Sequence, residues 1–369
     1  MPHLVCHQLF YVPKVGQSLG PIHLTFSSPM FVVVVGDAAA GKSQLLRLIS
    51  GQLSPTQGRV LFNSLETRRL NHDCPLVYTV GSWLQPHQSV SEALAWPLKV
   101  SGIPKTHREQ LVRQIAQKFN LVSYLHQRVD TLSESYRAML SIAQGLHSQA
   151  QLIVCDESLS GCSAATQAKL FQDLRDYSRY GLVVYATNRA QDVCQWSDYA
   201  VCLDAGQILD VVPTAEIQYA RLSLKASLML MPELCVISCP SQSYENGALI
   251  WLGEGPAIYV QGLPVGLLST IVIGIMPAAV SFTESAGRIP ATVQVLKTHG
   301  VGPDSEMVLS LGGQTMRKPW KHGGLPAVGE SITIYISLED CQFYDSSGHN
   351  LFNNNTGWTG TINFKSHVA

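Results

Sequence analysis

A glycine-rich segment at residues 36–43 combines the residue types and the spacing that bind phosphate. It reads G-D-A-A-A-G-K-S, follows an apolar run at 31–35 that predicts a buried strand, and precedes a helical pattern at 44–50. Such a turn presents backbone amides and the positive end of a helix dipole to an anion. An ordinary glycine turn with a surface lysine does not require this order of strand, loop and helix, so we interpret the segment as a P-loop that binds a nucleotide. The residues expected to line it are Gly36, Asp37, Ala38, Ala39, Ala40, Gly41, Lys42, Ser43 and Gln44.

Two adjacent carboxylates follow a second apolar run, residues 152–155. Asp156 and Glu157 therefore stand at the carboxyl end of a predicted strand, where open α/β sheets bind their ligands. Lys42 can reach the β- and γ-phosphates, while Ser43 and Asp156 can hold Mg²⁺. Glu157 can orient or deprotonate an attacking water. An acidic pair alone is more often a solvated loop, but the P-loop upstream favours the catalytic interpretation.

The elements that must position these residues alternate between strands and helices over residues 1–230. This alternation predicts an α/β domain, with a helical insertion at about 86–150 between two strands. From 231 to 369 the pattern changes to short alternating strands separated by Gly and Pro turns. We predict a small all-β barrel domain there.

The composition narrows the class of protein. The 25 basic and 26 acidic residues nearly cancel, which argues against a nucleic-acid surface. An apolar content of 46% with only 14% charged residues favours burial of surface in a larger assembly. No apolar run reaches the roughly 18 residues of a spanning helix, no secretory signal is evident, and the nine cysteines lack paired spacing. These features predict a cytosolic protein with reduced thiols.

With these residues in view, nearly the whole chain resembles the ATP-binding subunits of ABC importers. The resemblance is to the subgroup with a C-terminal regulatory β-domain, which includes importers of maltose, glycerol phosphate, polyamines and ferric iron. It implies a P-loop ABC-type ATPase domain with a helical insertion, followed by an OB/TOBE-like barrel. The segments that carry it are the P-loop, residues 46–51, 86–90, 132–137, 156–157, 185–187 and 203–206, and, in the last domain, 273–277 and 341–348.

The resemblance also implies ligands and partners. In that family two ATPase chains enclose two ATP molecules with Mg²⁺, each between the P-loop of one chain and the signature motif of the other. By position, Tyr11 would stack on adenine, Ser133 and Ser135 of the signature would face the partner's nucleotide, and Glu157 would be the general base. The expected partners are transmembrane permease subunits, a second ATPase chain or a second copy, and indirectly a solute-binding protein. The expected location is peripheral, on the cytoplasmic face of the inner (plasma) membrane, and a sugar-type solute is slightly favoured.

Several positions depart from the family pattern. Val80 replaces the Q-loop glutamine, Ser163 replaces an aspartate, and Asn188 replaces the switch histidine. Ser135 replaces a signature glycine beside Glu134, so a Cβ and a carboxylate stand where backbone should approach phosphate. Within the P-loop, Ala39 replaces a glycine, Asp37 introduces an acid and Gln44 replaces a threonine. Asparagine can donate a hydrogen bond to a γ-phosphate but carries no positive charge, so hydrolysis should be weak.

Two functions therefore stay open. The chain is either an importer ATPase with slow hydrolysis, in which Glu157 is the base and Asn188 a weakened γ-phosphate ligand, or a non-hydrolytic ATP-binding structural or regulatory subunit beside a conventional ATPase. A soluble ABC-type ATPase without a transporter is disfavoured by the importer-type C-terminal domain. The loop at 81–97 is the candidate groove for a coupling helix of the membrane subunit; the alternative is simple packing of the helical insertion. Its candidate contact residues are Trp83, Leu84, Pro86, His87, Val90 and Trp96.

Overall fold

The computed structural model describes residues 2–69, 76–81, 83–148, 150–252, 257–261, 263, 270–285, 288–299, 305–311, 313–320, 325–352 and 364–366. Contacts divide the chain into two compact units, Met1–Gln218 and Tyr219–Ala369. The division falls shortly before residue 230, where the sequence pattern changes. In the described ranges no helix is both long and apolar enough to cross a membrane, and the eight cysteines found there are free thiols.

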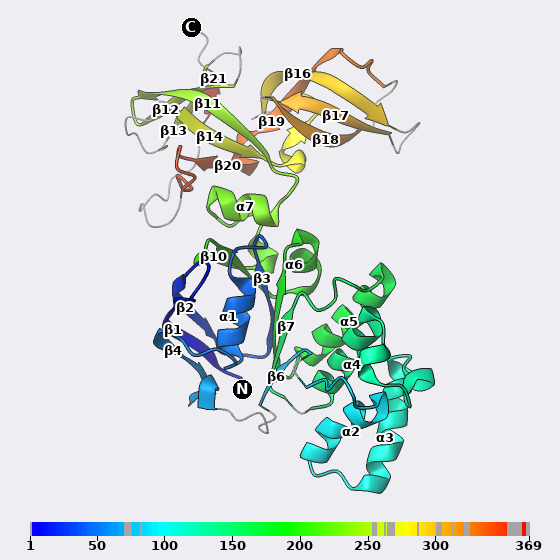
Figure 1. The fold of residues 1–369 in the computed structure, drawn as a ribbon. Helices are drawn as coiled ribbons and strands as arrows, with labels where there is room; N and C mark the ends of the chain where they lie inside the picture. The colour runs from blue at the N-terminus through cyan, green and yellow to red at the C-terminus, as the bar shows by residue number, and fades with distance from the viewer. Residues whose placement is uncertain are drawn as a thin grey trace. The chain divides into compact units, whose positions relative to one another are not determined.

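The first unit is built on a six-stranded sheet with the order β10-β9-β3-β8-β7-β6 (Figure 1). Neighbouring strands run parallel, except that β10 is antiparallel to β9. The apolar strands β3, β8 and β7 are almost completely buried, as expected for parallel strands covered on both faces. The predicted α/β architecture is confirmed. The strands are β3 (Met30–Val35), β6 (Val77–Thr79), β7 (Leu152–Asp156), β8 (Leu182–Thr187), β9 (Tyr199–Asp204) and β10 (Gln207–Pro213).

A smaller antiparallel sheet of the same unit has the order β2-β1-β4-β5. It consists of β1 (Leu4–Tyr11), β2 (Leu19–Phe26), β4 (Gln57–Phe62) and β5 (Leu65–Glu66). Its buried apolar side chains form one core with those of β3 and of α1 (Lys42–Ile49). This shared core holds the first turn of α1 against both sheets.

The helical insertion lies between β6 and β7. It contains α2 (Val90–Val100), α3 (Lys105–Lys118) and α4 (Glu134–Leu146), with short 3-10 turns at Val122–Tyr124 and Val129–Thr131. Ser89 and Glu92 form a reciprocal capping box at the start of α2. Two further helices, α5 (Ala164–Tyr177) and α6 (Ala190–Trp196), follow β7 and β8, and further 3-10 turns lie at Thr67–Arg69 and Thr214–Glu216.

The second unit contains two antiparallel sheets that share one apolar core. One has the order β20-β14-β11-β12-β13-β21 and the other β15-β19-β16-β17-β18, preceded by the helix α7 (Leu224–Leu230). The predicted all-β region is thus confirmed, and it consists of two half-barrel sheets. Its strands are β11 (Cys235–Tyr244), β12 (Gly247–Trp251), β13 (Ala257–Gln261), β14 (Thr270–Ile275), β15 (Val280–Ser281), β16 (Arg288–His299), β17 (Ser305–Leu311), β18 (Gln314–Trp320), β19 (Ser331–Ser337), β20 (Cys341–Tyr344) and β21 (Phe364–Ser366), with 3-10 turns at Pro277–Ala279 and Leu338–Asp340.

Candidate functional site

The P-loop forms a tight turn between β3 and α1. Gly36 is buried so closely against β9 that a Cβ at this position would lie 2.2 Å from the carbonyl oxygen of Leu203. Gly41 has φ +98°, a left-handed conformation that glycine adopts without strain. Two hydrogen bonds brace the turn, from Ala40 N to Asp37 O and from Gly206 N to Ala40 O, both 3.0 Å. Residues 37–39 remain exposed, so the loop backbone is held from behind and open in front.

Lys42 is the first residue of α1, and its side chain is only 3% exposed. Its Nζ donates to the carbonyl oxygens of Gly36 at 2.8 Å and Asp37 at 2.9 Å, and it lies 3.2 Å from Oε1 of Glu157. A buried ammonium group beside open backbone and a helix N-terminus suits a phosphate group. The cradle therefore fits the polyphosphate of a nucleotide.

The order of the strands explains how Glu157 comes to Lys42. β8 lies between β3 and β7, pairing Val35 with Thr187 and Ala186 with Asp156. Glu157 N donates to Ala186 O at 3.1 Å, and its φ of +44° is left-handed, a conformation that costs a side chain roughly 1–2 kcal/mol. The carboxyl ends of three parallel strands thus meet at one edge and join residues that are more than a hundred positions apart.

Ser43 and Asp156 supply the oxygen donors predicted for Mg²⁺. Ser43 is exposed at the start of α1, and Asp156 is half-buried at the end of β7. In the described residues no group of three or more His, Cys, Asp or Glu side chains could hold a metal ion. This sparse donor set fits Mg²⁺, which usually takes one or two protein ligands together with phosphate oxygens and water.

A buried brace positions Asn188 at the same edge. Thr187 Oγ1 donates to Asp192 Oδ2 at 2.8 Å and accepts from Arg189 N at 3.1 Å. Thr187 and Asp192 are 3% and 5% exposed, whereas Asn188 between them is exposed. Glu157 and Asn188 line a common hollow of about 30 Å³. The structure therefore brings together these two predicted residues.

The signature serines lie elsewhere in the unit. Ser133 caps α4 by accepting a hydrogen bond from Tyr136 N at 3.5 Å, and Ser135 Oγ lies 3.5 Å from Cys162 Sγ. The carboxyl group of Glu134 packs against Gly161, where a Cβ would lie 2.6 Å from its carboxyl carbon. Across the described residues, no hydrogen bond or ion pair joins these serines to residues 36–44. The chain does not bring its own signature to its own P-loop.

Tyr11 is half-buried at the end of β1 and packs on the apolar core. It pairs with Leu19 of β2, whose side chain borders Gly41 at 3.0 Å from a Cβ built there. Tyr11 is thus close to the start of α1, and its contact with adenine stays a prediction.

Three features escaped the sequence reasoning. The Lys42–Glu157 ion pair depends on strand order, which no local pattern reveals. The brace between Thr187 and Asp192 has a weak signal, a polar side chain five residues after a strand-terminal threonine. Arg189 sits between them and lines the same hollow, and only its neighbour Asn188 was singled out.

Comparisons with known proteins agree with this geometry. Residues 19–160 match the family model described as ABC transporter. A relative from Agrobacterium fabrum, the sn-glycerol-3-phosphate import ATP-binding protein UgpC 2, is 24% identical over 345 residues, covering 89% of this chain and 88% of that protein. The maltose/maltodextrin import ATP-binding protein MalK of Yersinia pestis is 25% identical over 346 residues, covering 89% and 91%.

Solved structures show the same fold. The dimeric ATP-binding cassette MJ0796 in a post-hydrolysis state with ADP and Pi aligns with a TM-score of 0.52 at 19% identity, covering 57% of this chain and 98% of that chain. A putative metal-chelate type ABC transporter in an inward-facing conformation aligns with a TM-score of 0.51 at 20% identity, covering 68% and 96%.

The first unit is therefore an α/β ABC ATPase domain by fold, and its P-loop lysine and strand-terminal carboxylates lie where that fold binds nucleotide. The chain is an ABC transporter ATP-binding protein, importer-like and distantly related to the MalK and UgpC subunits, with a C-terminal β region of two half-barrel sheets.

Proposed function

We propose that the chain is the ATP-binding subunit of an ABC import complex and that it couples ATP binding and weak hydrolysis to solute uptake. The observation that carries this proposal is the contact of Lys42 with Glu157 beside Asp156, because it puts a phosphate-binding cation, a base and a metal ligand at one sheet edge. The likeness to maltose and glycerol-phosphate subunits supports a sugar-type solute.

The residues have separate tasks in this proposal. Lys42 and the P-loop amides bind the phosphates, while Ser43 and Asp156 hold Mg²⁺, which neutralises phosphate charge when bound. Glu157 accepts a proton from the attacking water once Lys42 has turned to the phosphates. Asn188 donates a hydrogen bond towards the terminal phosphate, and Tyr11 stacks on the adenine.

Weak hydrolysis follows from what the site lacks. Loss of one electrostatic ligand of a transition state costs about 3 kcal/mol, or roughly a hundredfold in rate. Asn188 has no charge to offer, and Val80 ends β6 with an apolar side chain that donates only its backbone amide, to Val154 O at 2.9 Å. Ser163 caps α5 through Thr166 N at 3.3 Å and so serves its own chain.

The rival function is a non-hydrolytic ATP-binding subunit, structural or regulatory, paired with a conventional ATPase chain. The observation that favours it is the signature. Glu134 places a carboxylate at the start of α4, and Ser135 is engaged by Cys162 of the same chain. Both features weaken the grip of α4 on the phosphate of a partner's nucleotide.

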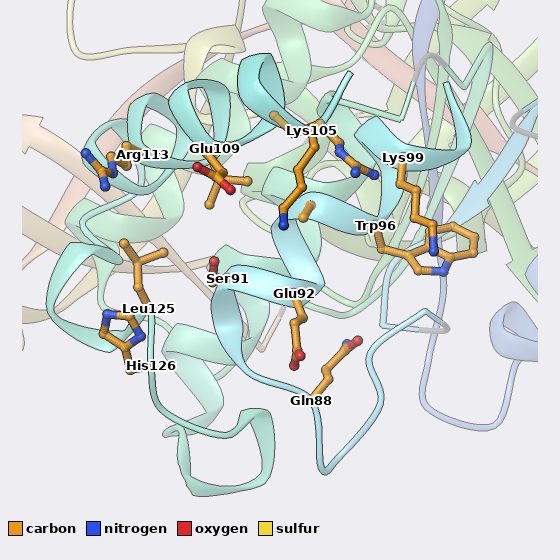
Figure 2. A pocket seen from close by; sticks show the side chains of 13 residues that line it. Gln88, Ser91, Glu92, Trp96, Lys99, Lys105, Glu109, Arg113, Leu125 and His126 are labelled. Atoms are coloured by element: carbon orange, nitrogen blue, oxygen red, sulfur yellow. The ribbon is translucent and has the colours of Figure 1, made fainter. Parts of the chain in front are cut away.

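A hollow of about 740 Å³ between α2 and α3 is the surface that we propose for the permease subunits. Figure 2 shows Lys105 extending into it from α3, with Trp96 of α2 beside it. Trp96 contacts Trp83, which contacts Tyr78 of β6, with ring centroids 4.5 and 4.7 Å apart. The predicted coupling loop therefore reaches both the hollow and the core sheet. Its lining favours a segment with an apolar ridge and acidic side chains, because four Lys and Arg residues outnumber two Glu. The charged residues are Lys99, Lys105, Arg108, Arg113, Glu92 and Glu109.

The complete assembly in this proposal is a pair of ATPase chains, either two copies or this chain with a second ATPase, under the permease on the cytoplasmic face of the inner membrane. A solute-binding protein would act through the permease.

Side-by-side measurement of Mg-ATP binding and turnover tests the proposal with the wild-type chain, Glu157→Gln and Lys42→Ala. We expect wild type and Glu157→Gln to bind ATP, Lys42→Ala to lose binding, and a slow wild-type turnover to disappear in Glu157→Gln. Binding without turnover above the Glu157→Gln background, even with permease subunits present, would establish the rival function. Absence of ATP binding would overturn both.

A further inference from the structure

Arg189 is held at the nucleotide edge by buried groups. Its backbone N–H donates to Thr187 Oγ1, which in turn donates to the buried Asp192. Thr187 ends β8, the strand between the P-loop strand and the strand that carries Glu157. The Cα of Arg189 is therefore fixed two residues beyond the centre of the site.

The guanidinium group of Arg189 has only partial compensation of its charge. NH1 donates to Gln167 Oε1 at 2.9 Å, and Nε lies 3.7 Å from Asp192 Oδ1, which is longer than a hydrogen bond. The side chain is 49% exposed. Gln167 is neutral and is itself held by donation of Nε2 to Leu159 O and Cys162 O, both at 3.0 Å. Arg189 thus has spare donors and exchangeable contacts.

The charge around the hollow makes a cation necessary for a phosphate there. Glu157 and Asp192 contribute carboxylates to its lining, Asn188 is neutral, and Arg189 is the one cation among the described lining residues. A terminal phosphate beside Glu157 would repel that carboxylate. Exchange of the neutral Gln167 contact for a phosphate oxygen would give Arg189 a charge-assisted hydrogen bond, which is about twice as strong.

We propose that Arg189 supplies the positive charge at the terminal phosphate that Asn188 cannot, and that it is the residue by which this chain distinguishes ATP from ADP. This assignment rests on the proposed ATP site. The side chain swings from Gln167 to the terminal phosphate when ATP binds, while ADP leaves it on Gln167.

The test is equilibrium binding of Mg-ATP and Mg-ADP to the full chain by titration calorimetry, without reference to turnover. We expect Arg189→Gln to weaken ATP binding by about tenfold or more, as loss of a charged hydrogen bond does, and ADP binding by less than about twofold. Arg189→Lys should retain part of the preference. The matched control is Arg179→Gln, which removes an exposed arginine paired with Asp176 on α5 and its C-terminal turn and should change neither affinity.

A second variant keeps the arginine and removes its resting partner. Gln167→Ala should leave the preference for ATP intact or increase it, because Arg189 no longer has to leave Gln167. Equal weakening of ATP and ADP in Arg189→Gln, or an unchanged ratio, overturns the assignment while the ATP site stands. If the wild-type chain binds neither nucleotide, the proposed function fails and the assignment fails with it.

Discussion

At the scale of single residues, this nucleotide site is a mixture of complete and altered groups. Lys42, Glu157 and Asp156 are present and lie together, because the ends of β3, β8 and β7 share one edge. Asn188 is at the same edge but is neutral. Chemistry at this site is therefore limited by missing charge and not by misplaced backbone, which makes single substitutions informative.

Restoring the missing charge should raise turnover. Asn188→His places an ionisable donor on the braced turn after β8, and we expect hydrolysis of Mg-ATP to rise by about tenfold or more, since one transition-state ligand is worth roughly 10²–10³ in rate. The measurement is steady-state phosphate release compared with wild type. Glu157→Gln in the same background is the control and should abolish the gain; a gain that survives it would show that Glu157 is not the base.

At the scale of elements, a buried polar cluster ties the central sheet to the helical insertion. The hydroxyl of Tyr78 on β6 donates to Ser141 O at 2.8 Å and lies 3.0 Å from Ser141 Oγ and 3.3 Å from Gln144 Oε1. Gln144 Nε2 donates to Ala93 O of α2 at 2.7 Å. Burial raises the pKa of the Tyr78 hydroxyl, which therefore stays protonated and donates. One hydroxyl links β6 to α4 and, through Gln144, to α2.

Removal of that hydroxyl should destabilise the first unit. Tyr78→Phe leaves Ser141 and Gln144, which are 1% and 0% exposed, without a partner, and we expect a loss of about 1–3 kcal/mol in the free energy of unfolding. Urea unfolding followed by far-UV circular dichroism measures it. Tyr180→Phe, at a tyrosine that is 80% exposed, is the matched control and should change stability by less than about 0.5 kcal/mol. Equal effects at both positions would contradict the role of the cluster.

A second tie between elements gives a pH dependence. Asp198, just before β9, accepts from Arg175 of α5 at 2.5 and 2.7 Å and from Phe31 N of β3 at 2.8 Å. Burial by itself raises the pKa of Asp198, but the bonds from Arg175 and Phe31 outweigh it and hold the pKa below its usual range. The folded pKa is therefore lower than the unfolded value of about 3.9. The stabilisation is present above that value and is lost as pH falls through the folded pKa.

We expect Asp198→Asn to lower the free energy of unfolding by about 1 kcal/mol at pH 7, a modest value because both side chains are about one-third exposed. The difference from wild type should shrink as pH falls below about 4. Urea unfolding at several pH values measures it. Asp176→Asn, in the more exposed pair with Arg179, should show no such trend, and a difference that is constant down to pH 3 would contradict the assignment.

At the scale of the whole molecule, every residue assigned to the nucleotide lies in the first unit, from Tyr11 to Arg189. That unit has its own core and two sheets. The second unit has a separate core and contributes none of these groups. Nucleotide binding is therefore expected to be a property of the first unit alone.

A chain that ends at residue 218 should accordingly fold and bind Mg-ATP within about threefold of the full chain, since it keeps the complete core. Calorimetric titration measures the affinity, and the same shortened chain with Lys42→Ala is the negative control. A folded shortened chain that binds no ATP, where the full chain does, would show that the C-terminal region completes the site.

The sequence by itself determined the class of fold, the P-loop and the carboxylate pair, because these depend on apolar runs and glycine spacing that are local along the chain. It also marked Asn188, Ser135 and Val80 as departures. Only the tertiary structure decided that Lys42 contacts Glu157 and that Arg189 lines the hollow beside Asn188. Strand order and side-chain packing set those contacts, and both arise from burial of residues far apart in sequence, which no local pattern encodes.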